Sequence, residues 1–263
     1  MLIDYHMHFM SHDVKGKFKP IDYVNSAKNR GLSEIGFSEH FAIKKIGQID
    51  YSMDYEELKK YIKAIKKLKE SSDFPVKIGL EMDFFPRLEK RIGETLKSYP
   101  FDYVIGSVHF IKEWPVDDPT SIPDYKKSNI NKLYEEYFNL IKQAIKSKLF
   151  DIIGHIDLIK IFGFKPKNDI TNLLEDIADT LKENKVCIEV NIRGLSKPCK
   201  EIYPSEKILS LCFERKVPIT LGSDAHSPEE VGKDFDKAVK MVKGIGYREI
   251  ARFTRREIEL VKL

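Results

Sequence analysis

Cysteine is scarce in this chain of 263 residues, occurring only at Cys187, Cys199 and Cys212. The three cysteines form no C-x-x-C pair, and their odd number leaves at least one thiol without a disulfide partner. These features argue against a disulfide scaffold and against a thiolate zinc site. We therefore expect a protein of a reducing compartment, the cytoplasm.

Long hydrophobic runs are also missing. No uninterrupted apolar segment approaches the length of about 18 residues that a membrane helix needs. The first ten residues hold Asp4, His6 and His8 in place of the basic and apolar parts of a secretory signal. The sequence therefore predicts neither export nor a membrane span.

The chain lacks a large excess of charge of one sign. Lysine and arginine total 45 against 41 aspartates and glutamates, a net charge of +4 that is spread along the sequence. This pattern does not support nucleic-acid binding, but it is compatible with a small anionic substrate. With 42% hydrophobic residues and no linker or repeat, the sequence predicts a single domain over residues 1–263.

Short β-rich runs alternate with longer amphipathic segments, a pattern typical of β/α units around a parallel sheet or barrel. Several of the runs are too apolar to be half-exposed, so we expect interior strands. Seven are predicted, at Leu2–His6, Glu34–Ser38, Val76–Met82, Asp102–Val108, Asp151–Ile156, Val186–Asn191 and Pro218–Ser223.

Two amphipathic segments between the strands predict helices with one buried face. Their apolar residues recur at three- and four-residue steps, as at Leu58, Ile62 and Ile65 and again at Tyr137, Ile141 and Ala144. The stretch from Ile111 to Asn129 is rich in proline and aspartate and breaks both periodicities, so we predict a long loop there. Such a loop is either a lid or binding loop, or a plain insertion.

The histidines are the most informative residues. Of the seven, all except His12 lie at or just after the C-terminal end of a predicted strand: His6, His8, His40, His109, His155 and His226. In a β/α barrel these strand ends converge on one mouth, where the loops supply catalytic groups. The six histidines are therefore predicted to meet at one site.

Metal binding explains the residues that accompany these histidines. Asp4, His6 and His8 alternate along the first strand and share a face, and Asp224 and His226 do so after the last strand. Glu81 follows an apolar run, and a carboxylate buried there needs a cation or a partner; a salt bridge to lysine is the alternative. Six histidines with Glu81 and Asp224 give eight donors, too many for one tetrahedral zinc ion and enough for two or three ions.

The motifs DYHMH, FSEH, GLEMDFFP, DYVIGSVHF, DIIGHIDLIKIFG, EVNIRGL and LGSDAH, in this order, resemble the polymerase-and-histidinol-phosphatase (PHP) family. The resemblance spans nearly the whole chain and is strongest to the monofunctional histidinol phosphatases. It implies a distorted (β/α)7, TIM-like barrel with three metal ions at the C-terminal strand ends. One ion would be held by His6, His8, Glu81 and Asp224, and a second by Glu81, His109 and His155, with Glu81 as the bridge.

The third ion implied by the resemblance would take His40, His226 and a histidine from the loop after the first strand. His12 is the candidate, although its spacing from His8 is short; a surface histidine is the alternative. The phosphate-binding residue is also open. Many relatives carry a basic residue after Gly-Leu, whereas this chain has Arg193 before Gly194, so Arg193, Lys197 and Lys160 are rival candidates.

The resemblance implies a metal-dependent phosphomonoesterase that hydrolyses L-histidinol phosphate in histidine biosynthesis. Two ions about 3.5–4 Å apart can activate a water for in-line attack on phosphorus. Glu81 would hold the ions, while Asp224 and His226 would also move protons to the leaving group. Imidazole with carboxylate suits zinc, iron or manganese.

Three alternatives remain open at this stage. One is another PHP phosphoesterase, acting on phosphotyrosine or a nucleotide. The second is a hydrolase of the amidohydrolase type, which also begins with H-x-H, and the third is a non-catalytic metal-binding module. The expected partner is a small phosphorylated substrate rather than nucleic acid or membrane, and the sequence leaves the oligomeric state open.

Overall fold

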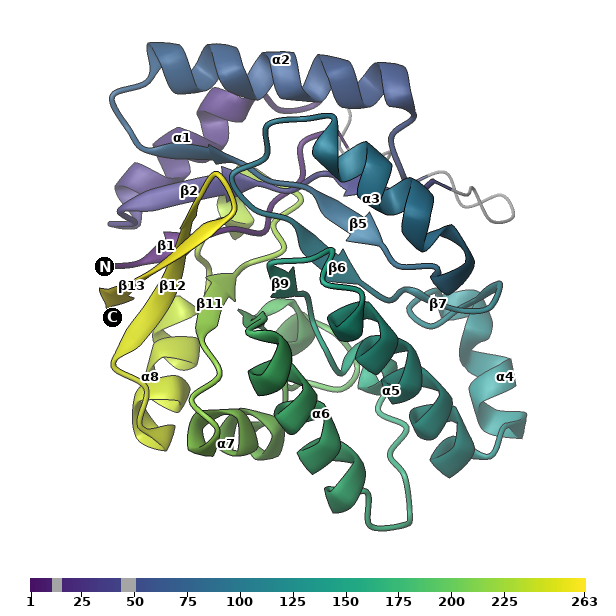
Figure 1. The fold of residues 1–263 in the computed structure, drawn as a ribbon. Helices are drawn as coiled ribbons and strands as arrows, with labels where there is room; N and C mark the ends of the chain where they lie inside the picture. The colour runs from purple at the N-terminus through teal and green to yellow at the C-terminus, as the bar shows by residue number, and fades with distance from the viewer. Residues whose placement is uncertain (11–15, 44–50) are drawn as a thin grey trace.

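The computed structural model describes residues 1–10, 16–43 and 51–263, with helices packed around a core of parallel strands (Figure 1). Each of the seven predicted strand regions contains strand, so the α/β fold is confirmed, but the strands are shorter than predicted. They are β1 (Ile3–Asp4), β2 (Glu34–Phe37), β4 (Val76–Ile78) with β5 (Glu81–Asp83), β6 (Ile105–Ser107), β9 (Ile152–Ile153), β10 (Cys187–Asn191) and β11 (Ile219–Gly222).

The parallel strands pair into two sheets, β1-β2-β4 and β11-β10-β9-β6-β5-β3, where β3 is His40–Phe41. Bonds from Gly79 N to Phe37 O (2.7 Å) and from Glu81 N to Glu39 O (3.1 Å) link the two sheets. At the other side, Tyr5 N donates to Leu221 O (3.2 Å) and Met7 bridges Ala225. In the described residues the strands therefore follow a barrel-like order without one closed ladder.

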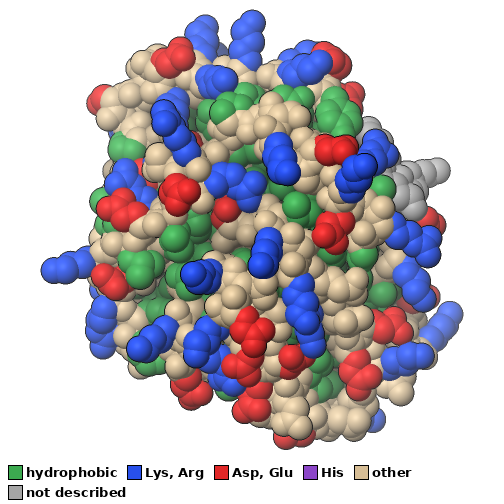
Figure 2. Space-filling model, viewed as in Figure 1, with side chains coloured by type: hydrophobic (Ala, Val, Ile, Leu, Met, Phe, Trp, Pro, Cys, Tyr) green, Lys and Arg blue, Asp and Glu red, His purple; other side chains and the backbone are tan. Residues whose placement is uncertain are grey.

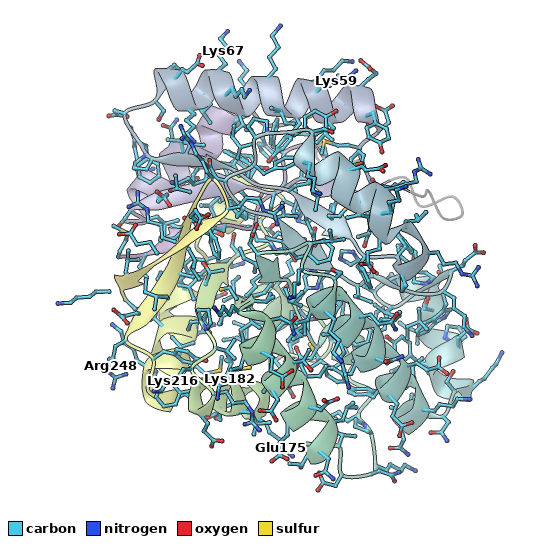
Figure 3. All side chains as sticks on the ribbon, in the orientation of Figure 1. Lys59, Lys67, Glu175, Lys182, Lys216 and Arg248 are labelled. Atoms are coloured by element: carbon cyan, nitrogen blue, oxygen red, sulfur yellow. The ribbon has the colours of Figure 1, made fainter. Side chains whose placement is uncertain are left out.

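Helices cover the strands on the outside (Figure 1). They are α1 (Pro20–Asn29), α2 (Tyr55–Ser71), α3 (Glu89–Lys97), α4 (Ile122–Lys127), α5 (Ile130–Lys146), α6 (Thr171–Asn184), α7 (Glu206–Glu214) and α8 (Phe235–Ile245). Helix α2 begins with a capping box in which the Asp54 side chain accepts from Glu57 N. Its predicted apolar face is buried, whereas Lys59 and Lys67 project outward (Figure 3).

The prediction of a continuous loop from Ile111 to Asn129 is wrong in part. A short hairpin of β7 (Phe110–Ile111) and β8 (Trp114–Pro115) opens the segment, and α4 occupies its second half. Pro119 and Pro123 lie in the first turn of a 3-10 helix (Pro119–Ser121) and of α4. The first N–H groups of a helix have no acceptor within the helix, so proline, which lacks an N–H, is well tolerated at these positions. Sequence analysis therefore misread these prolines as helix breakers.

A C-terminal hairpin covers the N-terminal ends of the parallel strands. It consists of β12 (Glu249–Thr254) and β13 (Glu257–Lys262), and sequence analysis did not predict it. Phe253 N donates to the Tyr5 hydroxyl (3.2 Å), and Arg256 N donates to Asp102 O (2.8 Å). The two termini lie side by side here (Figure 1). The opposite end of the strands carries the predicted donor residues.

The surface carries both signs of charge. On the face shown in Figure 2, lysine and arginine side chains alternate with aspartate and glutamate, and no stripe of one sign runs across it. Within the described ranges, none of the helices combines the length and the apolar character that crossing a membrane requires.

Candidate metal centre

Glu81, the first residue of β5, lies at the centre of a ring of histidines. Its Oε2 atom is 2.6 Å from His40 Nδ1, 3.3 Å from His6 Nε2 and 3.7 Å from His8 Nε2. Its Oε1 atom is 2.9 Å from His155 Nε2 and 3.6 Å from His109 Nε2. One buried carboxylate thus faces five histidines from four different strand ends.

The remaining two donors come from the turn after β11. Asp224 Oδ1 lies 3.5 Å from His8 Nε2 and 4.0 Å from His6 Nε2. Asp224 has a left-handed backbone (φ 56°), which aspartate tolerates better than most residues. His226 Nδ1 is 3.0 Å from the carbonyl oxygen of Asp224. The strand ends therefore bring all eight predicted donors of the described residues together.

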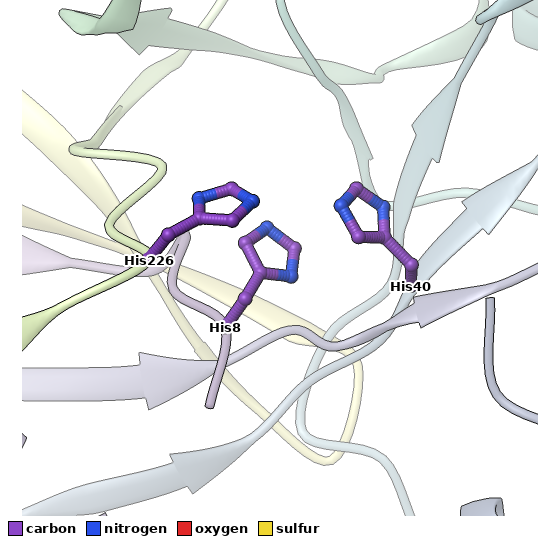
Figure 4. Close-up of side chains that lie close together, drawn as sticks. All are labelled: His8, His40 and His226. Atoms are coloured by element: carbon purple, nitrogen blue, oxygen red, sulfur yellow. The ribbon is translucent and has the colours of Figure 1, made fainter. Parts of the chain in front are cut away.

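Four overlapping groups of three donors have their ligand atoms within 4.8 Å of one another. They are His6, His8 and Glu81; His6, His155 and Asp224; Glu81, His109 and His155; and His8, His40 and His226. In the last group the three rings gather from β3 and from the loops after β1 and β11 (Figure 4). The rings of His8 and His40 stack with centroids 4.1 Å apart.

The donor atoms fit divalent metal ions. His6 Nε2, His8 Nε2 and Glu81 Oε2 are buried, and among the residues that the structure describes none of them makes a hydrogen bond of regular geometry, although Glu81 Oε2 lies close to His40 Nδ1. Buried polar atoms without partners are costly, and imidazole nitrogen with carboxylate oxygen is a donor set for zinc, iron or manganese. A cation between these atoms would satisfy them.

The buried carboxylates favour positive charge on the neighbouring histidines. Burial alone would lower the pKa of His8, but the neighbouring carboxylates of Asp224 and Glu39 raise it to about 9. Burial disfavours the charged form of Glu81 as well, yet the positive charges of His40 and His6 hold its pKa well below the usual range. The carboxylates of the cluster therefore stabilise positive charge placed among them, whether it is carried by an imidazolium or by a metal ion.

A family model for the PHP domain matches residues 4–193 of the chain. The chain belongs to the PHP domain family. This match spans the strands from β1 to β10, and with them all the donor residues except Asp224 and His226.

Named relatives of this PHP protein cover nearly its whole length. A probable histidinol-phosphatase of Deinococcus radiodurans is 34% identical over 242 residues, covering 91% of this chain and 92% of its own. The histidinol-phosphatase of Lactococcus lactis is 29% identical over 266 residues, covering 98% and 96%. The crystal structure of the Lactococcus lactis histidinol phosphate phosphatase, complexed with zinc, L-histidinol and phosphate, matches this fold with a TM-score of 0.83 over 98% of both chains, at 27% identity.

A second layer of carboxylates orients the histidines of the PHP site. The Nδ1 atoms of His6, His8 and His109 lie 2.5 Å from Glu189, 3.3 Å from Glu39 and 2.6 Å from Asp83, respectively. Holding Nδ1 in this way turns Nε2 toward the centre, an arrangement common around metal-bound histidine.

Sequence reasoning missed these three carboxylates. Glu189 lies in the apolar strand Cys187–Asn191, the same setting that singled out Glu81, so burial of a strand carboxylate was the available signal. Glu39 also accepts hydrogen bonds from Phe9 N (2.9 Å) and Met10 N (2.6 Å). These hydrogen bonds hold the segment after β1 against the site. No local sequence pattern predicts this contact.

The three candidate phosphate-binding residues differ in their surroundings. Arg193 lies beside the site, and its Nη1 atom is 2.6 Å from Glu230 Oε2, which also accepts from His226 N (2.8 Å). Lys160 is buried, with its Nζ atom 2.9 Å from Asp157 and 3.2 Å from Glu201. Lys197 is half-buried. His12 lies outside the described residues.

Proposed function

We propose that this PHP protein hydrolyses L-histidinol phosphate to L-histidinol and phosphate, as a cytoplasmic enzyme of histidine biosynthesis that acts through one catalytic domain. The main observation behind this proposal is that eight metal-donor side chains, with Glu81 at their centre, converge on one site. The names of its relatives, and the L-histidinol and phosphate bound in the Lactococcus lactis structure, support the choice of substrate.

The donor groups would hold up to three divalent ions, with Glu81 shared between two of them. The first set would be His6, His8, Glu81 and Asp224, and the second would be Glu81, His109 and His155. The third would be His40 and His226 with a further histidine. Sequence analysis suggests His12 for that position, whereas in the structure His8 lies close to His40 and His226. When bound, such ions activate a water molecule and neutralise the charge of the phosphate oxygens.

The side chains around the donors supply proton transfer and orientation. Burial and the neighbouring His8 lower the pKa of His226 to about 4, so its ring is neutral at pH 7, the form of imidazole that binds a metal ion. The ring is 19% exposed and its Nδ1 atom lies 3.6 Å from Asp224 Oδ1. We assign Asp224 and His226 to moving protons between the reacting groups and solvent.

Arg193 is the best placed of the three basic candidates for the phosphate group. Burial raises the pKa of Asp224, but the neighbouring histidines and then Arg193 hold it well below the usual range. Burial lowers the pKa of His226, and the positive charge of Arg193 lowers it further. Its planar guanidinium can hold two phosphate oxygens at once, which an ammonium group cannot. Both side chains are ion-paired, but the Lys160 ammonium is buried and bonds Asp157, Glu201 and the Ile202 carbonyl oxygen, whereas the Arg193 side chain is 20% exposed.

The test is a phosphate-release assay with the chelated and then reconstituted protein. We expect release from L-histidinol phosphate to require added Zn²⁺, Mn²⁺ or Fe²⁺ and to exceed release from phosphotyrosine, nucleoside monophosphates and p-nitrophenyl phosphate. Faster turnover of one of the other phosphates would reassign the substrate. Metal binding without any hydrolysis would identify a binding module instead.

A further inference from the structure

Ser107 is the last residue of β6, and its side chain lies directly against the central carboxylate of the site. Its hydroxyl donates a hydrogen bond of 2.7 Å to Glu81 Oε1. Both residues are buried, with exposed fractions of 0% for Ser107 and 1% for Glu81. Strand β6 runs parallel to β5, so this bond joins two neighbouring strands (Figure 1). Ser107 is not among the eight donor residues.

The period of the chain explains why this serine reaches the site. Ser107 and His109 are two residues apart, a spacing that directs both side chains to the same side of an extended segment. His109 Nε2 lies 3.6 Å from Glu81 Oε1, the same oxygen that accepts from the serine. The motif GSVH therefore supplies a metal donor and, two residues earlier, a hydroxyl that contacts Glu81.

Gly154, directly after β9, leaves room for this hydroxyl. A Cβ atom at Gly154 would lie 2.8 Å from Ser107 Oγ and 2.7 Å from Ile105 Cγ2, closer than real Cβ atoms approach. A side chain here would displace the hydroxyl or the neighbouring isoleucine. The next residue is the donor His155, whose Nε2 atom lies 2.9 Å from Glu81 Oε1. Residues of β6 and β9 thus meet at one oxygen of the carboxylate.

The two oxygens of Glu81 differ in their hydrogen bonds. Oε1 accepts from Ser107, whereas Oε2 makes no hydrogen bond of regular geometry within residues 1–10, 16–43 and 51–263. The last torsion of a glutamate side chain has a broad energy profile, so the carboxylate group rotates easily unless it is held. The serine hydroxyl therefore fixes which oxygen faces His109 and His155 and which faces His6, His8 and His40.

We propose that Ser107 is a positioning residue that holds Glu81 Oε1 for the metal ion on the side of His109 and His155. A carboxylate oxygen has two lone pairs, so Oε1 can accept from the hydroxyl and bind an ion at the same time. This inference rests on the proposed function, in which Glu81 is shared between two ions. It predicts that the hydroxyl affects one ion more than the others, because it bonds only one of the two oxygens.

The first test is a zinc titration of Ser107→Ala against a competing chelator, with the number of ions per chain followed by elemental analysis. We expect one ion to bind about 10- to 100-fold more weakly, and the others to bind within about threefold of the wild type, because the lost bond orients one ligand atom. Wild-type affinity for every ion would overturn the proposal. Equal weakening of every ion would also overturn it, since that result indicates a general disturbance of the site.

Ser38 offers a matched control. It lies directly after β2 and is fully buried, and its hydroxyl makes no hydrogen bond with the described part of the chain. Ser38→Ala therefore makes the same chemical change at another buried strand end without breaking a bond to Glu81. It should leave the zinc affinities as in the wild type. Affinities that fall equally in both alanine variants would assign the effect to packing and contradict the positioning role.

Ser107→Thr is the conservative variant, because it keeps the hydroxyl. It should bind every ion as the wild type does, whereas equal losses in the threonine and alanine variants would show that the hydroxyl is not the cause. At saturating zinc, Ser107→Ala should lower kcat by the same factor for L-histidinol phosphate and p-nitrophenyl phosphate, since the serine acts through Glu81. A loss confined to one substrate would contradict this.

The zinc titration uses no substrate, so it separates this inference from the proposed function. A wild-type protein that binds two or more ions but does not hydrolyse L-histidinol phosphate contradicts the proposed substrate, and the titration still decides the role of Ser107. A wild-type protein that hydrolyses L-histidinol phosphate, with Ser107→Ala binding zinc normally, contradicts the positioning role alone.

Discussion

Gly222 provides a sharp test of the second layer because any side chain there collides with Glu189. A Cβ atom at this position would lie 1.9 Å from Glu189 Oε1, 2.8 Å from Glu189 Cδ and 2.9 Å from His6 Cβ. The carboxylate would have to move by more than 1 Å to reach ordinary contact, which breaks its 2.5 Å bond to His6 Nδ1. Gly222→Ala should therefore disturb the orientation of His6 without touching any donor atom.

The expected magnitude has two parts. Overpacking a buried site costs about 1–3 kcal/mol, and losing a charged hydrogen bond costs about 1.5–3 kcal/mol. Together they come to about 2.5–6 kcal/mol, which lowers Tm by about 5–24 °C in a chain of this size. Freed from its carboxylate, His6 should bind metal less well, and loss of such partners typically reduces metal affinity about 10- to 100-fold.

The assay combines thermal unfolding of the metal-free protein with a zinc titration against a competing chelator. Gly244→Ala is the matched control, since a Cβ at Gly244, inside α8, meets no atom within 4 Å. It should stabilise the protein by about 0.5–1 kcal/mol through helix propensity and leave zinc affinity unchanged. A Gly222→Ala protein with wild-type Tm and zinc affinity would refute the role assigned to Glu189.

Four further outcomes test the donors and their neighbours. Glu81→Gln should abolish turnover and lower metal content by more than one ion's share in elemental analysis, and full stoichiometry would contradict the bridging assignment. His12→Ala should empty one site and reduce the rate about tenfold or more if His12 is a ligand, whereas unchanged metal content and rate would identify a surface histidine. Arg193→Ala should lower kcat/KM about 10²-fold, or about 3 kcal/mol, and weaken inhibition by phosphate, with Arg193→Lys raising chiefly KM; wild-type kinetics would transfer the role to another cation. In the metal-free protein the pKa values of His8 and His109 are raised from 6.5 to about 9 and about 10. Protonation of these two rings therefore contributes its full stabilisation of the fold below pH 6.5. That stabilisation should disappear as the pH rises through 9–10, lowering Tm, and zinc binding at pH 7 should release protons into a weakly buffered indicator solution; a pH-independent Tm would argue against these shifts.

Sequence reasoning located the parallel strands well because an apolar run bounded by polar turns is a local signal. It missed the β12–β13 hairpin, whose two-residue turn is Arg255-Arg256 with φ values of 52° and 67°. Turns with positive φ at both positions usually carry asparagine and glycine, so this turn has no recognisable sequence signature. It also misread Pro119 and Pro123, which lie in the first turns of a 3-10 helix and of α4, because proline breaks a helix in its interior but is tolerated in its first turn.

The sequence by itself determined which groups are available and roughly where they lie. Residue type gives the chemistry of His6, His8, Glu81 and the other donors. The alternation of apolar strand segments with amphipathic helical segments places these donors at strand ends. These are local properties, and a single sequence displays them directly.

Only the tertiary structure decided how those groups meet. It placed Glu81 among five histidines, set Glu189 against His6 across 183 residues and paired Arg193 with Glu230. It also brought Val116 back to His109 through a hairpin inside a segment that sequence analysis treated as one loop. Distances between residues far apart in the chain depend on how strands and loops pack, and changes of about 1 Å decide whether a carboxylate orients a histidine or clashes with a neighbouring Cβ.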